Sequence, residues 1–425
     1  MDVTDHDERL GDLIAYLDAS PSPWHAVRST VERLTGSEPL AEDDAWRSVP
    51  RRGHAVRDGA IIAWSIPDGA TPTGGFRIVG AHTDSPCLRV TPRPDTSTLG
   101  WKQLDVEVYG GILNNTWLDR DLGVAGRIVL DDGTEVLVDV GEGIARVPQL
   151  AVHLDREVNE NGLKLDRQRH LVPVWGIGPS HPGEFAEWIG ERAGASGAAC
   201  WWDLCLYDTQ GAAVLGADRS MLASGRLDNL LSCWAATTAL EASSASDHPS
   251  DHVAVIVLND HEEVGSASTT GAQGPFLESV LHRLVADLGG SADDVHRAFA
   301  SSACVSADNA HAVHPNYVER HDPNHRPLVG GGPAIKVNAN QRYATSPRTA
   351  SLFQRACESR NVPWQVFVSA SDMPCGSTIG PVTATRLGIE TLDVGVPQLS
   401  MHSARELCGV ADPLHLTTAL TAFLT

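Results

Sequence analysis

The segment 253–268, with the sequence VAVIVLNDHEEVGSAS, constrains the fold of this 425-residue chain more than any other. Its first six residues are small or branched and apolar, which is typical of a strand buried on both faces of a parallel sheet. Two adjacent carboxylates, Glu262 and Glu263, follow the strand closely. Ligands bind outside the carboxyl ends of strands in open α/β sheets. The segment therefore predicts an α/β fold with a candidate site at this strand end.

The glutamate pair has two interpretations. In a hydrolase, one carboxylate can bind a metal ion while its neighbour moves protons, because adjacent side chains diverge. Taken alone, Glu262 and Glu263 also suit an acidic helix N-terminus or the rim of a loop. The hydrolase interpretation therefore depends on partner residues elsewhere in the chain.

Composition excludes several classes of protein. The chain has 32 Lys and Arg against 54 Asp and Glu, a formal net charge of −22, which is the opposite of what nucleic-acid binding needs. Any pocket for an acidic ligand must therefore rely on local cations. Eight scattered cysteines without a CxxC pair indicate reduced thiols. Neither a signal peptide nor a run of about 18 apolar residues is visible. We expect a cytoplasmic protein without nucleic-acid or membrane partners.

Length and sequence texture indicate two domains. Residues 104–109 alternate polar and apolar side chains, and residues 127–138 have the pattern of a hairpin. These half-polar strands differ from the continuous apolar strand at the start of the glutamate segment. We therefore predict a main domain made of 1–92 and 222–425, interrupted by a β-rich inserted domain over 93–221.

Further candidate ligands lie at strand ends or helix starts. They are His82, Asp228, Asp308 and His402, with Asp84 as a carboxylate that could orient the His82 ring. Each has an ordinary alternative, since an Asp at a helix start is commonly an N-cap and a His-x-Asp sequence also occurs in plain loops. Together with the glutamate pair, however, this mixture of imidazoles and carboxylates suits borderline divalent ions such as zinc. A carboxylate can also bridge two such ions roughly 3.5–4 Å apart, an arrangement used in hydrolysis.

Seven sequence blocks resemble those of one enzyme family. In chain order they are GAHTDSPCL, RLDNL, DHEEVGS, SADNAHAVHPNY, GPAIKVNANQRYAT, MPCGSTIGP and PQLSMHSARE. They are similar to aspartyl aminopeptidases, the M18 family of dizinc metallopeptidases, and the resemblance extends to PQLAVHLDREVNE in the insertion. It implies a zinc-peptidase α/β/α sandwich with a mixed, largely parallel sheet, and a β-rich inserted dimerisation domain. It also implies dimers assembled into a tetrahedral dodecamer.

The metal ligands follow from this resemblance. It implies two divalent ions per subunit, with zinc expected and cobalt or manganese as alternatives. The first ion would be held by His82, Asp228 and Asp308. The second would be held by Asp228, Glu263 and His402, so that Asp228 bridges the two ions.

Catalytic roles follow from the same resemblance. Glu262 would be the general base, which takes a proton from the metal-activated water and passes it to the leaving amine. Asp84 would orient His82 through the far ring nitrogen. The peptide bond between Asp228 and Asn229 is expected to be cis.

The implied reaction is removal of an N-terminal Asp or Glu from a peptide. Lys336 would pair with the acidic side chain, although without the resemblance it suits a solvated strand edge. His311 and Tyr343 would contact the substrate or stabilise the oxyanion of the tetrahedral intermediate. His153, whose surroundings alone indicate a structural residue, would be offered by the inserted domain to a neighbouring subunit's active site. Whether it serves its own subunit instead is left open.

Two positions depart from the family pattern. Asp260-His261 precedes the glutamate pair where relatives often carry Asp-Asn, and Ser224-Gly225 precedes an arginine where a proline is common. Neither removes a ligand, although His261 could be mistaken for one. Two alternatives remain: another dizinc hydrolase, such as an M42-like aminopeptidase of broad specificity or a deacylase, and a shell-forming scaffold without activity. Lys336 argues against the first alternative and Glu262 against the second.

Overall fold

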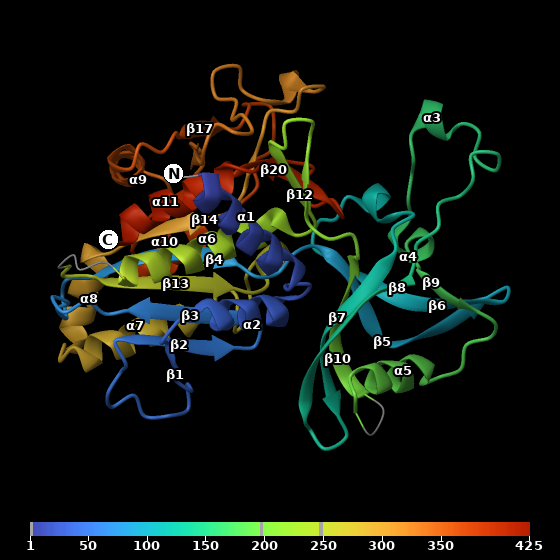
Figure 1. Ribbon diagram of the computed structural model, residues 1–425, viewed down its shortest axis with the longest axis horizontal. Helices are drawn as coiled ribbons and strands as arrows, with labels where there is room; N and C mark the ends of the chain where they lie inside the picture. The colour runs from blue at the N-terminus through green and yellow to red at the C-terminus, as the bar shows by residue number, and fades with distance from the viewer. Residues whose placement is uncertain (1–2, 196–198, 246–249) are drawn as a thin grey trace.

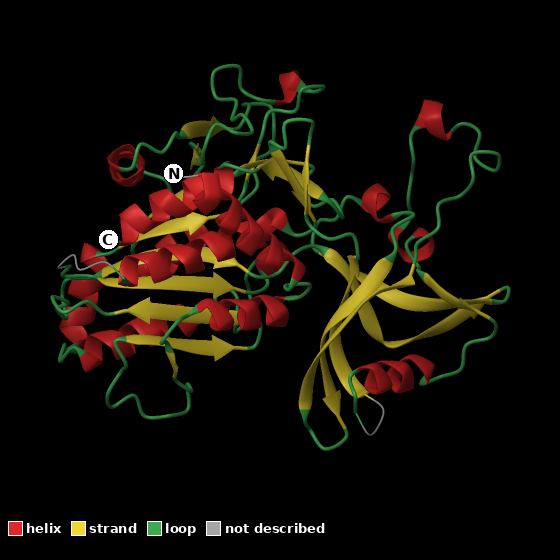
Figure 2. Cartoon of the chain, in the orientation of Figure 1, coloured by secondary structure: helices red, strands yellow, loops and turns green. Residues whose placement is uncertain are grey.

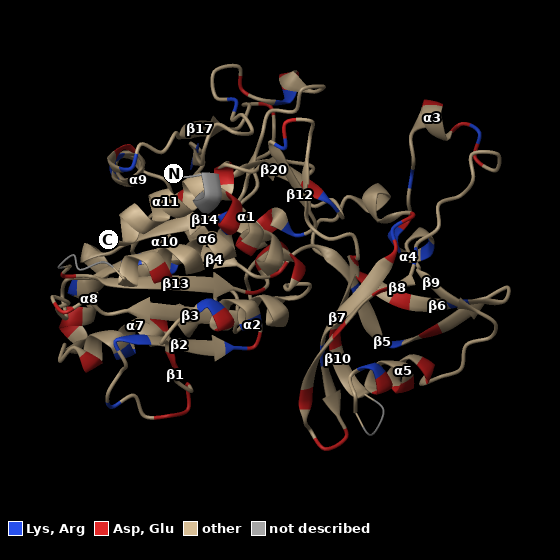
Figure 3. Cartoon of the chain, viewed as in Figure 1, with Lys and Arg blue, Asp and Glu red and all other residues tan. Residues whose placement is uncertain are grey.

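The computed structural model describes residues 3–195, 199–245 and 250–425. Two large β-sheets lie in separate halves of the molecule (Figure 1). One sheet is covered by helices on both faces, and the other carries a single longer helix (Figure 2). Asp and Glu residues are spread over both halves of this chain (Figure 3), whose formal net charge is −22. Among the helices of the described residues, none is long and apolar enough to cross a membrane.

The first half is built on a nine-stranded mixed sheet, in the order β1-β2-β3-β13-β4-β14-β18-β16-β17. The central strands β13, β4, β14 and β18 are mutually parallel, while β3 and β16 run antiparallel to their inner neighbours. The strands are β1 (Glu38–Pro39), β2 (Arg52–Arg57), β3 (Ala60–Ser65), β4 (Phe76–His82), β13 (Val253–Asn259), β14 (Ala303–Ala307), β16 (Ala334–Val337), β17 (Gln365–Val368) and β18 (Glu390–Gly395).

Helices cover both faces of this sheet, so the expected α/β/α sandwich is confirmed. One face packs against α1 (Val3–Asp18), α2 (Pro23–Arg33), α6 (Leu227–Ser244), α9 (Pro347–Ser359) and α11 (Asp412–Leu424). The other face packs against α7 (Phe276–Asp287), α8 (Ala292–Ser301) and α10 (Ile379–Leu387).

Strand β13 explains why both faces need a cover. Its side chains alternate between two separate apolar cores: Ile256 and Leu258 belong to the core under α6, and Val255 and Val257 belong to the core under α7. Every residue of the strand is buried. Exposing either face would cost about 1.5–3 kcal/mol for each large apolar side chain. A continuous apolar strand therefore requires a three-layer arrangement.

The second half is built on a six-stranded antiparallel sheet, in the order β8-β7-β10-β5-β6-β9. Its strands are β5 (Cys87–Thr98), β6 (Trp101–Tyr109), β7 (Leu122–Leu130), β8 (Glu135–Ala145), β9 (Val174–Ile177) and β10 (Ala199–Asp208). Helix α5 (Glu184–Arg192) packs on one face through Phe185 and Ile189. Residues 148–166, which we call the arm, project away from both sheets with the short helix α3 (Val158–Asn161) at the tip, before α4 (Arg167–His170) (Figure 1).

The limits of the insertion, expected at 93–221, can be compared with the limits of the sheets. The six-stranded sheet begins at Cys87, and Pro92 and Pro94 lie within β5, at an irregularity of its pairing with β6. At the other end, a small five-stranded sheet joins residues on both sides of position 221. Its strands are β11 (Ala213–Leu215), β12 (Met221–Ser224), β15 (Ala310–His311), β19 (Pro397–Leu399) and β20 (Glu406–Gly409). We propose 87–208 as the limits of the insertion.

Candidate active site

Three parallel strands end at the same edge of the nine-stranded sheet and deliver most of the candidate ligands. His82 is the last residue of β4 and pairs with Asn259, the last residue of β13. The glutamate pair follows β13 in a short 3₁₀ turn (Glu262–Val264), and Asp308 follows β14 directly. The carboxyl ends of parallel strands meet at one edge. His82 therefore lies beside Glu262, which is 180 positions later in the sequence, and beside Asp308.

Asp228, at the start of α6, lies between the two candidate histidines. Its Oδ1 is 3.5 Å from His82 Nε2, and its Oδ2 is 3.6 Å from His402 Nε2. Asp308 Oδ1 lies 3.8 Å from His82 Nε2, and Glu263 Oε2 lies 3.4 Å from His402 Nε2. Among the described residues, three groups have possible ligand atoms within 4.8 Å of one another. Two are the groups expected from the resemblance, His82, Asp228 and Asp308, and Asp228, Glu263 and His402; the third is His82, Glu262 and Glu263. The Asp228 carboxylate belongs to both of the expected groups.

This arrangement fits two zinc-like ions. Two donors that hold one tetrahedral ion at about 2.1 Å lie about 3.4 Å apart, close to the separations observed. Within the described part of the chain, Asp228 Oδ1 and Glu263 Oε1 are buried without a hydrogen-bond partner. A buried oxygen left in that state costs free energy, and a bound cation would satisfy it. The donor set, two imidazoles and three carboxylates, is the kind that zinc prefers.

The pKa shifts point to an excess of negative charge. Burial opposes protonation of His402, but the Asp228 and Glu263 carboxylates outweigh it and raise its pKa to about 11. In the same way, burial is outweighed at His82, whose pKa is well above the ordinary value. Burial is the main cause that raises the pKa of Glu262 to about 8 and that of Glu263 to about 7. The cluster therefore favours positive charge among its carboxylates.

Asp84 supports both sides of the cluster. It is fully buried, and its Oδ1 and Oδ2 accept the backbone N–H groups of Glu262 and Glu263, each at 3.1 Å. Tyr109, at the end of β6 in the insertion, donates its hydroxyl to Asp84 Oδ2 at 2.7 Å. The Nδ1 atom of His82 is 3.0 Å from the backbone carbonyl oxygen of Asp84 and 3.4 Å from its Oδ1. Asp84 therefore orients the glutamate backbone as well as the imidazole.

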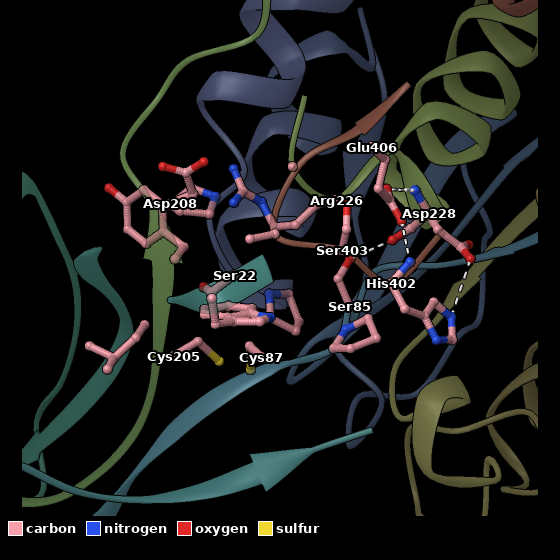
Figure 4. A pocket seen from close by; sticks show the side chains of 18 of the residues that line it. Ser22, Ser85, Cys87, Cys205, Asp208, Arg226, Asp228, His402, Ser403 and Glu406 are labelled. Carbon is pink, nitrogen blue, oxygen red and sulfur yellow. Dashed lines mark hydrogen bonds and ion pairs between the residues drawn. The ribbon is translucent and has the colours of Figure 1, made fainter. Parts of the chain in front are cut away.

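Glu406 is a supporting residue that the sequence analysis missed. Its side chain is buried, and its Oε2 accepts the backbone N–H of Asp228 at 2.9 Å while Oε1 accepts that of His402 at 2.7 Å. Figure 4 shows this carboxylate between the two candidate ligands, beside a small cavity of about 30 Å³. Gln398 donates to Oε1 at 3.3 Å and accepts from Asn309, the neighbour of Asp308, at 3.0 Å. One buried network thus links the backbone around three candidate ligands.

The insertion also holds His402 directly. Its Nδ1 lies 3.1 Å from the carbonyl oxygen of Gly111, which accepts the ring hydrogen. The backbone N–H of Leu113 donates to the His402 carbonyl at 2.9 Å, and Thr116 Oγ1 accepts the N–H of Ala404 at 3.0 Å. A hydrogen bond at the far nitrogen fixes which ring nitrogen faces a metal ion.

Lys336 is buried beside the cluster, with only 2% of its surface exposed. It lies on β16, and its Nζ is 3.5 Å from Asp308 Oδ2 and 5.3 Å from the centre of the Tyr343 ring. His311, at the end of β15, has a lowered pKa because of burial and the nearby ammonium of Lys336. The solvated strand edge that the sequence left open for Lys336 is therefore excluded.

Two other histidines lie apart from the candidate ligands. The ring of His261 is engaged through Nδ1, 2.9 Å from Ser268 Oγ and 3.1 Å from Thr270 Oγ1, and it belongs to neither ligand group. His153 is exposed on the arm. No ligand group or ion pair found in the described part of the chain includes His153. The peptide bond between Asp228 and Asn229 is cis, as expected.

Glu406 and Tyr109 differ in how strongly the sequence signals a supporting role for them. Glu406 stands four positions after His402 in the block PQLSMHSARE, which is a weak signal for a supporting role. Tyr109 ends an alternating strand of the insertion and carries no signal at all. Only the packing of the two halves reveals it.

Comparisons with known proteins bear on this site. The family model described as aminopeptidase I zinc metalloprotease (M18) matches residues 16–424. A probable M18 family aminopeptidase 2 of Streptomyces coelicolor is 54% identical over 417 residues, which cover 97% of this chain and 96% of the relative. Among solved structures, a chain of the Ape4 and Nbr1 complex has a TM-score of 0.94 at 34% identity, covering 99% of this chain and 86% of that chain.

A second solved structure, the mApe1 dodecamer of yeast, has a TM-score of 0.86 at 26% identity and covers 99% of this chain and 97% of its own. The family model spans almost the whole chain, and more than half of the aligned residues are identical in the Streptomyces relative. The chain therefore belongs to the M18 family of zinc aminopeptidases.

Proposed function

We propose that this M18 aminopeptidase removes N-terminal Asp or Glu from peptides and uses two divalent metal ions, most simply zinc. The observation that carries the specificity is the buried ammonium of Lys336 beside the candidate ligands. Burying a lysine is costly unless it is paired. Its partner, Asp308, is also a candidate metal ligand, and an ion held by Asp308 would take part of that negative charge. A carboxylate from the substrate would then complete the pairing of Lys336.

The reaction can be assigned to residues of the chain. Bound divalent ions supply Lewis-acid polarisation of the scissile carbonyl and lower the pKa of an attacking water. Glu262 lies within ligand distance of His82 and Glu263 but belongs to neither group that Asp228 shares, and it takes the proton of the attacking water and delivers it to the leaving amine. Asp84 holds the backbone N–H of Glu262 and so fixes where this base stands. His311 and Tyr343, which both lie near Lys336, contact the substrate or stabilise the oxyanion of the tetrahedral intermediate.

Assembly belongs to the same proposal. The solved mApe1 neighbour is a dodecamer, and we infer that this chain also forms a homo-oligomer, built from dimers into a tetrahedral dodecamer. The exposed arm supports this, because Leu150, Val152 and Leu154 leave a large part of their apolar surface in solvent. His153 lies among them and would enter the active site of a neighbouring subunit.

The location proposed for the protein is the cytoplasm. All eight cysteines are free thiols, and six of them are buried. Unpaired thiols in this number are typical of a reducing compartment. A protein of an oxidising compartment would be expected to pair some of these cysteines in disulfide bonds.

A dizinc hydrolase of broader specificity is the second candidate. The contact that favours it is the 3.5 Å separation of Lys336 Nζ and Asp308 Oδ2. If this pair persists when metal is bound, Lys336 has no need of an acidic substrate. A scaffold without activity gains no support, because the ligand groups and Glu262 lie together at one strand edge.

Hydrolysis of chromogenic amides tests the specificity. Asp-, Glu-, Leu- and Lys-capped substrates would be compared on the wild type, on Lys336→Ala and on the charge-keeping Lys336→Arg. We expect the wild type to cleave the acidic pair alone, Lys336→Ala to lose that preference, and Lys336→Arg to keep part of it. Equal cleavage of the Leu and Asp substrates would leave the family assignment intact and refute the acidic pocket.

A further inference from the structure

A second cavity, of about 220 Å³, adjoins the candidate active site at His311. Its wall carries three basic side chains, His311, Arg320 and His321, and it carries no Asp or Glu. The net charge of the chain is −22, so a concave surface with this lining is a local exception. Concave sites lined by one sign of charge concentrate ligands of the opposite sign.

The cavity shares a wall with the place expected for the first residue of the substrate. The Phe367 ring is 6.2 Å from the His311 ring and 6.3 Å from each of the His321 and Tyr343 rings, measured between ring centres. Tyr343 in turn lies against Lys336. A substrate that places its first side chain beside Lys336 and its scissile carbonyl near His311 would therefore have the basic cavity next to it.

The hydrogen bonds of the cavity leave donors for an anion. His321 Nε2 lies 3.3 Å from the carbonyl oxygen of His311. A carbonyl only accepts, so Nε2 carries the hydrogen. His321 Nδ1 is buried and has no partner among the described residues. In the described chain, no carboxylate forms an ion pair with Arg320, whose planar guanidinium suits bidentate binding of a carboxylate.

We propose that this cavity is a second anion-binding subsite, which receives a carboxylate of the peptide beyond its first residue. The proposal rests on the proposed function, since the first side chain is taken to lie beside Lys336. Two sources of the carboxylate fit the same chemistry. One is the C-terminal carboxylate of a short peptide, and the other is an acidic side chain on the second residue.

Four dipeptides separate these sources. Asp-Ala is compared with Asp-Ala amide, which lacks the C-terminal carboxylate, and Asp-Glu amide is compared with Asp-Gln amide, which lacks only the side-chain charge. Release of free aspartate gives kcat/KM for the oligomeric, metal-loaded wild type, for Arg320→Ala and for Arg326→Ala. Arg326 is exposed in the same loop but does not line the cavity, so its variant controls for a change in net charge.

We expect the wild type to prefer the charged member of one pair by roughly tenfold, the usual effect of a charge-assisted hydrogen bond. The pair that shows the preference identifies the source of the carboxylate. Arg320→Ala should lose most of this ratio, Arg320→Lys should recover part of it, and Arg326→Ala should keep it.

Two results would overturn the subsite. One is a wild type that prefers the charged member of neither pair, and the other is a preference that survives in Arg320→Ala. Failure of the underlying specificity looks different: Leu-capped amides would be cleaved as well as the Asp substrates, or in their place. The same comparison would then be made with Leu-Ala and Leu-Ala amide and with Leu-Glu amide and Leu-Gln amide.

Discussion

Glu406 offers the sharpest test of how the metal centre is held. In Glu406→Gln the side chain keeps its shape but only one acceptor oxygen, whereas the native carboxylate accepts two backbone N–H groups, those of Asp228 and His402. One of these groups would face an NH₂ group. A buried N–H group left without its acceptor costs about 1–3 kcal/mol, or roughly 5–150-fold in a binding constant. Loss of partners that orient metal ligands has effects of about that size.

The assay is a titration of metal-free protein with Co²⁺, followed by the absorption of the bound ion, and with Zn²⁺ in competition with a fluorescent chelator. We expect Glu406→Gln to bind at least one ion about 10–100-fold more weakly than the wild type. Asp412→Asn is the matched control. Asp412 is also buried and accepts two backbone N–H groups, from Gly330 at 2.6 Å and Gly332 at 2.8 Å, but these belong to a loop that carries no candidate ligand.

Thermal unfolding without metal separates positioning from folding. Both variants should lower Tm of the metal-free protein, because each disturbs a buried carboxylate. Only Glu406→Gln should also weaken metal binding. Wild-type affinity in Glu406→Gln, or an equal loss of affinity in Asp412→Asn, would refute the assignment of Glu406 to the metal centre.

Two further predictions concern the insertion and the response to acid. Tyr109→Phe removes the 2.7 Å hydrogen bond to Asp84 and should weaken metal binding about tenfold or more, measured in the same titration; an unchanged affinity would show that the phenol only packs. Burial, and then the charges of Arg28 and Arg226, lower the pKa of His25 to about 4. The folded state therefore favours the neutral ring. In the unfolded state the histidine titrates near its ordinary value of about 6.5, so acid favours unfolding. Between pH 7.5 and pH 5 the wild type should lose about 2 kcal/mol from this group, and His25→Asn should show a smaller fall in Tm over that range; an equal fall would count against it.

The fold and the candidate ligands could be predicted because both depend on short-range patterns. The apolar run of β13 demands cover on both faces, and an abrupt change to polar residues marks each strand end. Once β4, β13 and β14 pair in parallel, His82, the glutamate pair and Asp308 must meet. The parallel direction of these strands is enough to predict that their carboxyl ends meet at one edge of the sheet.

Two supporting residues, Glu406 and Tyr109, could not be predicted, because their partners come within reach only in the tertiary structure. Glu406 binds N–H groups that only the tertiary structure brings within reach, and no residue type is required at the position of those N–H groups. Tyr109 depends on how the insertion packs against the sandwich. The start of the insertion was expected at 93, where the sequence texture changes, whereas strand β5 begins at Cys87 and includes Pro92 and Pro94.

The contact between the insertion and the candidate ligands gives the molecule a mechanical property. All the candidate ligand side chains belong to the sandwich, yet the phenol of Tyr109 and the carbonyl of Gly111, which aim Asp84 and His402, belong to the insertion. The orientations of Asp84 and His402 therefore depend on how the insertion is placed against the sandwich. A shift of one half by the length of a hydrogen bond would leave every ligand present but badly aimed. Whatever force holds the halves in register, from within the chain or from a neighbouring subunit, consequently acts on the chemistry as well.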